Sequence, residues 1–518
     1  MQSFNLINGN IITLNDNEPL VNSLSVDKGK IISLNKTISK FKTIDLNRAT
    51  VIPGFIDAHF HLKNYGKRLD QVDLKGLKSL DEIQGVLENK LQSIDDGQWI
   101  LGFGWDQNLW QEKKFPDKNF LNYIAPKNPV YLTRIDGHSA WVNNSAIQLT
   151  GNTVSKLNDV DGGQVINDCI MIDNSMNSFK HLLPNEELSQ IKKWILTAAQ
   201  NAYKMGITGV HDAWQDRKTV QAIEELIDEK KFPIRCYGML AGNDDKLLDQ
   251  YFNSGHYHNE YYTIRSVKAF IDGALGSRGA ALHEPYCDDS NNCGLILITN
   301  ERFSDLAQQC FKNNFQLNTH AIGDRGNHYV LNHYGSVLSK ENNRRWRIEH
   351  AQMVADEDVL LFKKYNILPS MQPSHCTSDM NWLPDRIGNH RLKLISRWKT
   401  FIDQGLKIPG GSDCPIETGN PLFEFYAAIT RQDHTGYPIH GFQPQEKINR
   451  LNALQMFTTW AAYGGFDEQR RGKIDIGFDA DLTILDNDIL TVESKDILNS
   501  KILYTIVNGY IDNNINQL

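Results

Sequence analysis

Residues 55–61, FIDAHFH, place two histidines two positions apart at the end of a short apolar run. Side chains at positions i and i+2 of a β-strand point to the same face, so we expect His59 and His61 to face the same side. A single buried histidine is usually a satisfied core residue, but a pair at the end of a strand favours metal binding. Because imidazole binds zinc, iron and nickel, this stretch predicts a metal site where the strand ends.

Seven more strand-like segments follow the first, and helix-like stretches such as KTVQAIEELIDEK separate most of them. Strands that alternate with helices predict a parallel sheet, and eight of them predict an α/β fold of the (β/α)8 type, the TIM barrel. The eight predicted strands are Phe55–His61, Gly206–Asp212, Ile234–Leu240, Val267–Gly273, Gln316–Ile322, Arg347–Gln352, Ile367–Pro373 and Lys407–Asp413.

The predicted barrel, 55–466, has attachments at both ends and one long interruption. The ends, 1–54 and 467–518, read as short strands joined by Asn-Gly and Lys-Gly turns, and neither has enough strands to bury a face alone. We therefore expect the two ends to form one composite β-sandwich, with two separate strand layers on the barrel as the alternative. A stretch at about 65–200 is too long for one crossover and is interpreted as an insertion that helps to form the substrate pocket.

Composition excludes several classes of protein. The 518 residues are 40% hydrophobic, 22% charged and 10% aromatic, which is typical of a globular chain and not of a disordered one. No apolar run approaches the ~20 residues that span a bilayer, so no membrane partner is expected. The net charge of -8 argues against nucleic acid. The start, MQSFNLINGN, has no pattern of a secretion signal, and seven scattered cysteines fit reduced thiols, which together predict a cytoplasmic protein.

Three more candidate ligands end predicted strands. His320 ends the fifth strand, His350 the sixth, and Asp413 the eighth. Catalytic residues of barrels gather at the carboxyl ends of the strands, so these side chains are expected to meet His59 and His61. Separate structural roles would require an independent explanation for each residue.

Lys268 faces inward in the predicted fourth strand, where an ammonium is costly to bury. One interpretation is a salt bridge or a side chain that reaches out to water. The other is carbamylation by CO2, which turns the amine into a carboxylate-like anion able to bridge two divalent ions. His59, His61 and Asp413 would then hold one ion, with His320 and His350 on the other.

The same motifs resemble the amidohydrolase superfamily, and longer stretches resemble its YtcJ-like branch, which includes N-substituted formamide deformylases. The stretches are PGFIDAHFH, FIDGALGSRGAAL, NTHAIGDRGN, RIEHAQ, GGSDCPIE and GKIDIGFDADLTILD. The resemblance covers nearly the whole chain and implies hydrolysis of a small molecule at a carbonyl or related centre. It implies two zinc ions bridged by carboxylated Lys268, with iron or manganese as alternatives, and a homodimer; the sequence itself leaves the oligomeric state open.

Metal chemistry agrees with this resemblance, because a bound divalent ion lowers the pKa of water to ~7 and polarises a carbonyl. Asp413 is expected to accept the proton of the water and to deliver it to the leaving amine. The leading hypothesis is therefore a hydrolase of carbon–nitrogen bonds other than peptide bonds, acting on an N-acyl or N-formyl amine. The alternatives are a cyclic-amide hydrolase or a deaminase on the same site, and an inactive barrel with a binding or regulatory role.

Six further residues are predicted around the metal site. Trp105, His138 and Arg278 are expected to bind substrate, with packing as the alternative for the tryptophan and loop-stabilising hydrogen bonds as the alternative for the other two. A second group is expected to orient the ligands through hydrogen bonds. Its members are His211, Asp324 and Glu349.

Overall fold

The computed structural model describes residues 2–135, 139–184 and 186–511. The chain divides into two units: the first comprises Met1–Leu62 with Ala198–Leu518, and the second comprises Lys63–Thr197.

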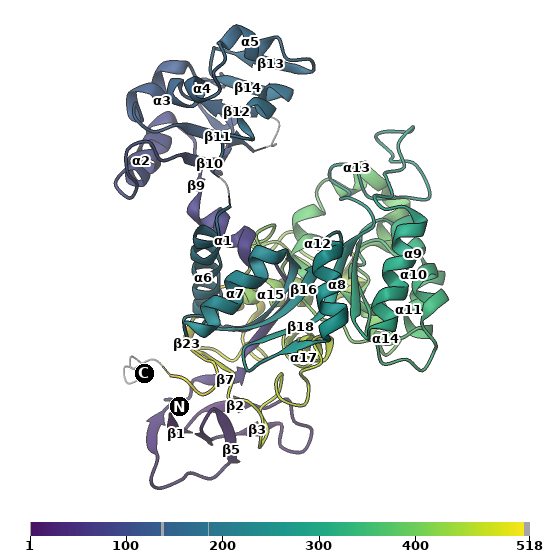
Figure 1. The fold of residues 1–518 in the computed structure, drawn as a ribbon. Helices are drawn as coiled ribbons and strands as arrows, with labels where there is room; N and C mark the ends of the chain where they lie inside the picture. Colours follow the sequence, from purple (N-terminus) through teal and green to yellow (C-terminus); the bar gives the residue numbers. More distant parts are fainter. Residues whose placement is uncertain (1, 136–138, 185, 512–518) are drawn as a thin grey trace. The chain divides into compact units, whose positions relative to one another are not determined.

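Seven parallel strands form a nearly closed barrel in the first unit (Figure 1). Each strand pairs with the next one along the chain, as a barrel of β–α repeats requires. In spatial order they are β8 (Phe55–Phe60), β15 (Ile207–Gln215), β16 (Arg235–Ala241), β18 (Tyr262–Phe270), β19 (Gln316–Ala321), β20 (Arg347–His350) and β21 (Leu368–Ser370).

The predicted eighth strand, Lys407–Asp413, is not a regular strand. The segment makes only isolated parallel bridges to the two edge strands, Phe60 with Cys414 on one side and Met371 with Gly410 on the other. It contains a proline, which has no N–H to donate, and two adjacent glycines, which favour irregular backbone. The prediction of a continuous eighth strand was therefore wrong, although the segment occupies the gap between β21 and β8.

Amphipathic helices alternate with these strands and pack against them. In α7 (Arg217–Asp228), the apolar side chains of Val220, Ile223 and Leu226 are buried at helical spacing. The carboxylate of Asp216 accepts a hydrogen bond from the amide of the third helical residue and caps the helix. The other crossover helices are α8 (Asp245–Ser254), α9 (Asn300–Lys312), α10 (Asp324–Val337) and α11 (Asp356–Lys364).

Seven further α-helices follow β21 in the described part of the first unit. They are α12 (Pro373–Asp379), α13 (Leu383–Ile387), α14 (Trp398–Asp403), α15 (Pro421–Thr430), α16 (Arg450–Met456), α17 (Thr459–Gly464) and α18 (Ser494–Ile497).

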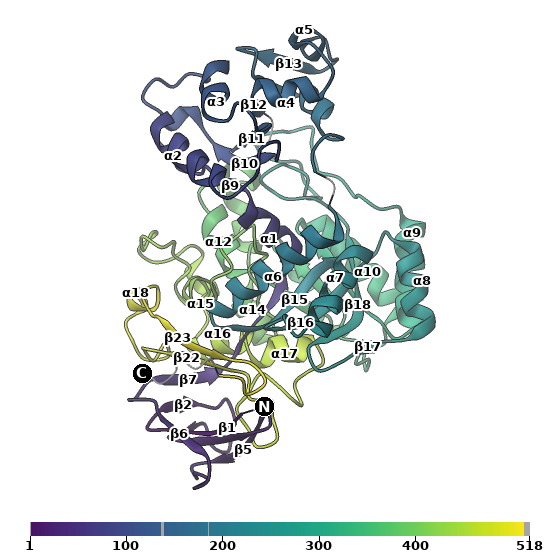
Figure 2. The same ribbon diagram turned by 60° about the vertical axis from the view of Figure 1, so that its left-hand side comes forward.

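The two chain ends form two sheets that share one hydrophobic cluster. The first sheet has the order β5 (Lys30–Leu34), β4 (Leu24–Asp27), β1 (Ser3–Ile7), β6 (Lys42–Asp45). The second has the order β23 (Ile502–Ile506), β22 (Leu482–Leu485), β7 (Thr50–Pro53), β2 (Asn10–Ile12), β3 (Leu20–Val21). Figure 2 shows the C-terminal strand β22 beside the N-terminal strand β7, with which it pairs in antiparallel register. The shared cluster contains residues of both chain ends, such as Leu6 and Val51 from the first and Leu482 and Ile506 from the second.

A buried ion pair joins these sheets to the barrel. Arg235, on β16, donates two hydrogen bonds of 3.0 Å to the carboxylate of Asp481. Both side chains are nearly inaccessible to water, which makes the pair sensitive to the loss of either partner.

The second unit is built on a six-stranded sheet with short helices around it. The strand order is β13 (Gly163–Ile166), β14 (Ile170–Asp173), β12 (Ser139–Val142), β11 (Val130–Arg134), β10 (Ile100–Trp105), β9 (Val72–Asp73). The helices are α1 (Leu62–Asp70), α2 (Leu80–Leu91), α3 (Lys118–Ile124), α4 (Asn144–Leu149), α5 (Val154–Asn158) and α6 (Leu188–Lys204), of which the first starts and the last ends in the first unit. Within the described part of the chain, no helix has the length and apolar character needed to cross a bilayer.

Candidate active site

The carboxyl ends of the barrel strands bring together the six side chains predicted to bind metal. Ring centroids lie 5.4 Å apart for His59 and His61, 4.9 Å for His59 and His350, and 4.5 Å for His320 and His350. His59 lies in β8, His61 directly follows it, His320 lies in β19 and His350 ends β20. Four imidazoles from three strands therefore meet at one end of the barrel.

A carboxylate lies among these imidazoles. The Oδ1 atom of Asp413 is 3.1 Å from Nε2 of His61 and 3.4 Å from Nε2 of His59. One donor atom from each of His59, His350 and Asp413 lies within 4.8 Å of the other two.

Lys268 is completely buried in β18, and its Nζ atom lies 3.2 Å from Nε2 of His59. The amine thus belongs to the same cluster as the imidazoles, on the Nε2 side of His59.

Two of these residues adopt an unusual backbone conformation. His350 has φ = 74° and Asp413 has φ = 57°, both in the left-handed region that residues other than glycine rarely occupy. Such strain costs of the order of 1–3 kcal/mol per residue and is found where the surrounding structure enforces a functional geometry. The strain at both residues favours a functional role for this cluster.

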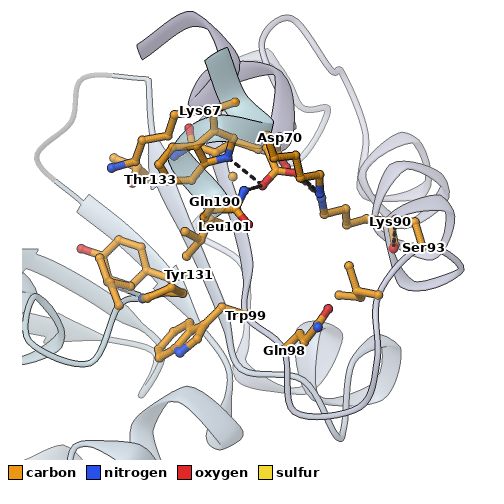
Figure 3. Close-up of a pocket in the computed structure, with 17 residues that line it drawn as sticks. Lys67, Asp70, Lys90, Ser93, Gln98, Trp99, Leu101, Tyr131, Thr133 and Gln190 are labelled. Atoms are coloured by element: carbon orange, nitrogen blue, oxygen red, sulfur yellow. Dashed lines mark hydrogen bonds and ion pairs between the residues drawn. The ribbon is translucent and has the colours of Figure 1, made fainter. Parts of the chain in front are cut away.

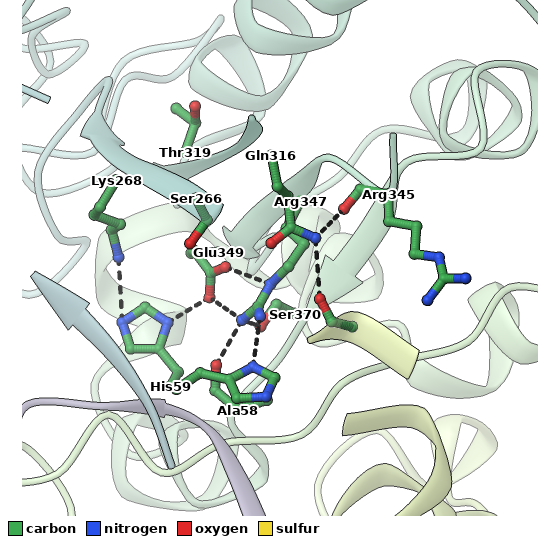
Figure 4. Close-up of polar contacts among 12 residues, drawn as sticks. Ala58, His59, Ser266, Lys268, Gln316, Thr319, Arg345, Arg347, Glu349 and Ser370 are labelled. Atoms are coloured by element: carbon green, nitrogen blue, oxygen red, sulfur yellow. Dashed lines mark hydrogen bonds and ion pairs between the residues drawn. The ribbon is translucent and has the colours of Figure 1, made fainter. Parts of the chain in front are cut away.

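Hydrogen bonds fix the orientation of two imidazoles. Nδ1 of His59 lies 2.5 Å from Oε2 of Glu349, while Nε2 of the same ring faces Lys268 (Figure 4). Nδ1 of His350 lies 2.7 Å from Oε1 of Gln372. Carboxylate and amide oxygens accept hydrogen bonds, so Nδ1 carries the proton in both rings and each Nε2 keeps its lone pair.

Burial keeps three imidazoles of the cluster neutral, those of His59, His320 and His350. It lowers the pKa of His59 to about 4, together with the charge of Lys268, and it lowers the pKa of His320 to about 3. The pKa of His350 is also held well below its usual value, again mainly by burial. Neutral imidazole is the form that binds a metal ion, so these rings are ready to bind one at physiological pH.

The pKa values of the Lys268 amine and the Asp413 carboxylate are both lowered as well. Burial lowers the pKa of Lys268 to about 8, although Glu349 and Asp413 act against this change. Burial alone would raise the pKa of Asp413, but the neighbouring histidines, His59 first, hold it well below its usual range. Asp413 is thus an ionised carboxylate, and Lys268 is an amine that loses its proton readily.

The chemistry of this donor set fits a divalent transition metal. Imidazole nitrogens with free lone pairs and an ionised carboxylate are the ligands that zinc, iron and manganese accept. The residues that would hold the metal are His59, His61, Lys268, His320, His350 and Asp413.

Comparison with known proteins agrees with this chemistry. Residues 42–511 match the model of the amidohydrolase family Amidohydro_3. The chain belongs to the amidohydrolase family.

Relatives of this amidohydrolase cover nearly its full length. It is 30% identical to Protein LONG AFTER FAR-RED 3 of Arabidopsis thaliana, over 97% of this chain and 90% of the relative. It is 29% identical to the putative amidohydrolase YtcJ of Bacillus subtilis, over 90% of each chain. It is 24% identical to the N-substituted formamide deformylase of Arthrobacter pascens, over 99% of this chain and 98% of the relative.

A solved structure shares the fold. An uncharacterized metal-dependent hydrolase from Pyrococcus horikoshii superposes with a TM-score of 0.81 and 27% sequence identity, and the match covers 95% of this chain and 99% of that one.

Two residues expected to orient ligands lie beside the cluster of this amidohydrolase. Glu349 contacts His59 across the barrel rather than its chain neighbour His350. Nδ1 of His211 accepts a hydrogen bond of 2.9 Å from Arg347, which in turn contacts Glu349. Burial and the charge of Arg347 hold the pKa of His211 well below its usual value, so this ring is neutral.

Three other predictions need correction. Trp105 is fully buried in the core of the second unit, where its indole N–H donates to the carbonyl of Leu132. It packs, and it offers no surface to a substrate. Among the described residues, Asp324 accepts hydrogen bonds from the backbone amides of His283 and Arg325, and neither of these two residues is a predicted metal ligand.

Arg278 forms a two-pronged ion pair with Asp288 at 2.9 and 3.0 Å, which is the loop-stabilising alternative to substrate binding. His138 lies outside the described residues, and its predicted contact with substrate stays a prediction.

Several polar residues near the site were missed. Asp57, buried in β8, accepts hydrogen bonds from the amide of His59 and the hydroxyl of Ser412, and burial raises its pKa to about 7. Asp272 accepts three backbone amides and lies 3.6 Å from Nε2 of His320.

His375 was missed too. Its Nε2 lies 3.8 Å from Oδ2 of Asp413, and its ring stacks on that of His350 at 5.8 Å. The signal was present in the sequence, because Gln372 lies at the end of the seventh predicted strand and His375 lies two residues beyond that strand, where barrel active-site residues occur.

The second unit contains a separate cavity of about 600 Å³ that the sequence did not indicate (Figure 3). Its walls carry Trp99 and Tyr131, and the carboxylate of Asp70 accepts hydrogen bonds from Trp194 and Gln190. Among the residues that the structure describes, no predicted site residue lines this cavity.

Proposed function

We propose that this amidohydrolase is a metal-dependent hydrolase that cleaves the C–N amide bond of a small N-acyl or N-formyl amine. The observation that carries the proposal is the cluster of His59, His61, His320, His350 and Asp413 at one end of the barrel, with Lys268 inside it. The linear amide as substrate draws on the similarity to a protein named N-substituted formamide deformylase.

A divalent ion bound by these residues would lower the pKa of water and polarise the substrate carbonyl. Asp413 then acts as the proton carrier. Its carboxylate accepts the proton of the attacking water as the C–O bond forms, and returns it to the amine nitrogen as the C–N bond breaks. The low pKa of Asp413 ensures that the carboxylate is free of its proton when the reaction starts.

Lys268 would bridge two ions after carbamylation. The neutral amine attacks CO2, a new N–C bond forms, and one proton is released, which leaves a carbamate anion. With a pKa of about 8, roughly a tenth of the amine is neutral at pH 7, far more than for an ordinary lysine. The charges of Glu349 and Asp413 favour the protonated form of this amine. If Lys268 stays unmodified, it supplies no bridging anion, and we expect a single-metal site.

Metal content and activity test this function together. Purified protein is assayed for bound zinc, iron and manganese, and then against a panel of formamides, N-acyl amines, lactams and aminopurines. His59→Ala and His320→Ala should each lose metal and activity, whereas His333→Ala, which contacts Asn300 on α9, should keep both. Full activity in a metal-free variant that carries both His59→Ala and His320→Ala would refute the metal mechanism. Release of ammonia would identify a deaminase, and turnover of lactams alone would identify a cyclic-amide hydrolase.

A further inference from the structure

The guanidinium of Arg347 links its own strand to three other strands of the barrel. Arg347, on β20, is completely buried. Its Nη2 atom donates to the carbonyl of Ala58 on β8 and, at 2.8 Å, to the hydroxyl of Ser370 on β21, and its Nη1 atom donates to His211 on β15. An isolated buried charge would be prohibitively costly, so this arginine requires a buried anion.

Glu349 is that anion, and it connects Arg347 to His59. Oε1 of Glu349 lies 2.7 Å from Nε of Arg347, and Oε2 lies 3.1 Å from its Nη2. The same Oε2 atom accepts the Nδ1 proton of His59, so the carboxylate lies between guanidinium and imidazole (Figure 4). A carboxylate held in this way can only accept, and it therefore fixes the tautomer of His59 as well as the plane of its ring.

His350 is oriented by different means. Its Nδ1 donates to the neutral amide of Gln372, whose Nε2 donates to the carbonyl of Ser370 at 3.3 Å. An amide is neutral and needs no counter-charge. Arg347 therefore supports His59, which the carboxylate of Glu349 orients. It does not support His350, which the amide of Gln372 orients.

We propose that Arg347 is a positioning residue for metal binding that acts through Glu349 on His59. This inference rests on the proposed metal site but not on the proposed substrate. Arg347 neutralises Glu349 and holds its carboxylate in place; Glu349 then keeps Nδ1 of His59 protonated, with the lone pair of Nε2 directed at the site.

A double-mutant cycle on metal affinity tests this order of action. Zinc affinity is measured by competition with a chromophoric chelator for the wild type, Arg347→Met, Glu349→Ala and the double variant. Each single change should weaken affinity about 10- to 100-fold, the usual effect of losing a group that orients a metal ligand. In the Glu349→Ala background, Arg347→Met should have almost no further effect on affinity. Independent effects that multiply, or unchanged affinity in either single variant, would overturn the proposal.

Matched variants separate positioning from stability. Tyr262→Phe removes the hydroxyl that donates to the buried Gln215, so it should lower Tm without changing zinc affinity. Glu349→Gln keeps an oxygen acceptor for Nδ1 of His59 and should retain more zinc affinity than Glu349→Ala. The glutamine variant also provides the test if the alanine variant fails to fold. Equal losses of Tm and affinity in every variant, Tyr262→Phe included, would show a purely structural role.

A second readout works without metal. In protein labelled with ¹⁵N-histidine, the His59 ring, assigned by its absence in His59→Asn, should show protonated Nδ1 and unprotonated Nε2. Arg347→Met and Glu349→Ala should mix the two tautomers. A wild-type protein that binds no zinc would refute the metal site, while this spectrum would still decide whether Arg347 and Glu349 orient the ring. A single tautomer in all variants would overturn the positioning role.

Discussion

Lys268→Met tests how much stability the protein loses by burying a charged amine, because Lys268 is completely buried in the barrel. Burial lowers the pKa of its amine from the usual 10.5 to about 8. At 1.36 kcal/mol per pKa unit, this difference means that the metal-free protein loses ~3 kcal/mol of stability at neutral pH by keeping the ammonium buried. Methionine has a similar length and no charge, so we expect the metal-free variant to be up to ~3 kcal/mol more stable than wild type at pH 7.

The pH dependence gives the sign of the effect. Between about pH 8 and 10.5, the unfolded chain binds more protons at Lys268 than the folded chain does. The stability of the wild type relative to the variant therefore increases as the pH rises through this window. The advantage of Lys268→Met should therefore be constant below pH 8 and shrink by ~2 kcal/mol between pH 7 and 9.5.

Urea unfolding of chelator-treated wild type and Lys268→Met, followed by circular dichroism at both pH values, measures this difference. A variant that is less stable than wild type at pH 7, or an advantage that does not narrow at pH 9.5, would refute the reasoning. The same variant should bind less metal, because the lysine is retained at the cost of stability for the sake of function.

Three further predictions test other parts of the structure. Arg235→Met leaves buried carboxylates without their arginine and should lower the free energy of unfolding by ~3 kcal/mol in urea titrations, an effect that a surface ion pair would not give. Trp105→Phe removes the buried indole N–H and should cost ~1–3 kcal/mol, while KM stays unchanged; a raised KM would return this residue to the substrate pocket. Asp272→Asn should weaken zinc affinity about 10-fold because this carboxylate lies beside a predicted ligand, whereas Asp324→Asn should not; the reverse order would contradict the placement of both residues.

The strand periodicity of the sequence was sufficient to find the cluster. A period of two residues placed His59 and His61 on one side, and the rule that barrel sites lie at carboxyl strand ends selected His320 and His350. The same rule should have selected His375, but a single histidine after a weak strand carries little signal by itself.

Contacts between distant strands were not predictable from one sequence. The link from Arg347 to His211 joins residues 136 positions apart, and nothing local indicates it. Trp105 illustrates a different limit, because an indole serves a core and a pocket wall equally well and its sequence neighbours do not distinguish the two. The prediction of the eighth strand was wrong because its proline and glycines interrupt the hydrogen-bond ladder that the apolar pattern suggested.

Anomalous diffraction from metal-loaded crystals, recorded at the absorption edge of the bound metal, tests the central claim most directly. The account predicts at least one anomalous peak within bonding distance of His59, His350 and Asp413, with Lys268 extended by a carbamate if a second peak is present. Metal bound elsewhere, with these side chains in contact only with each other, would contradict it.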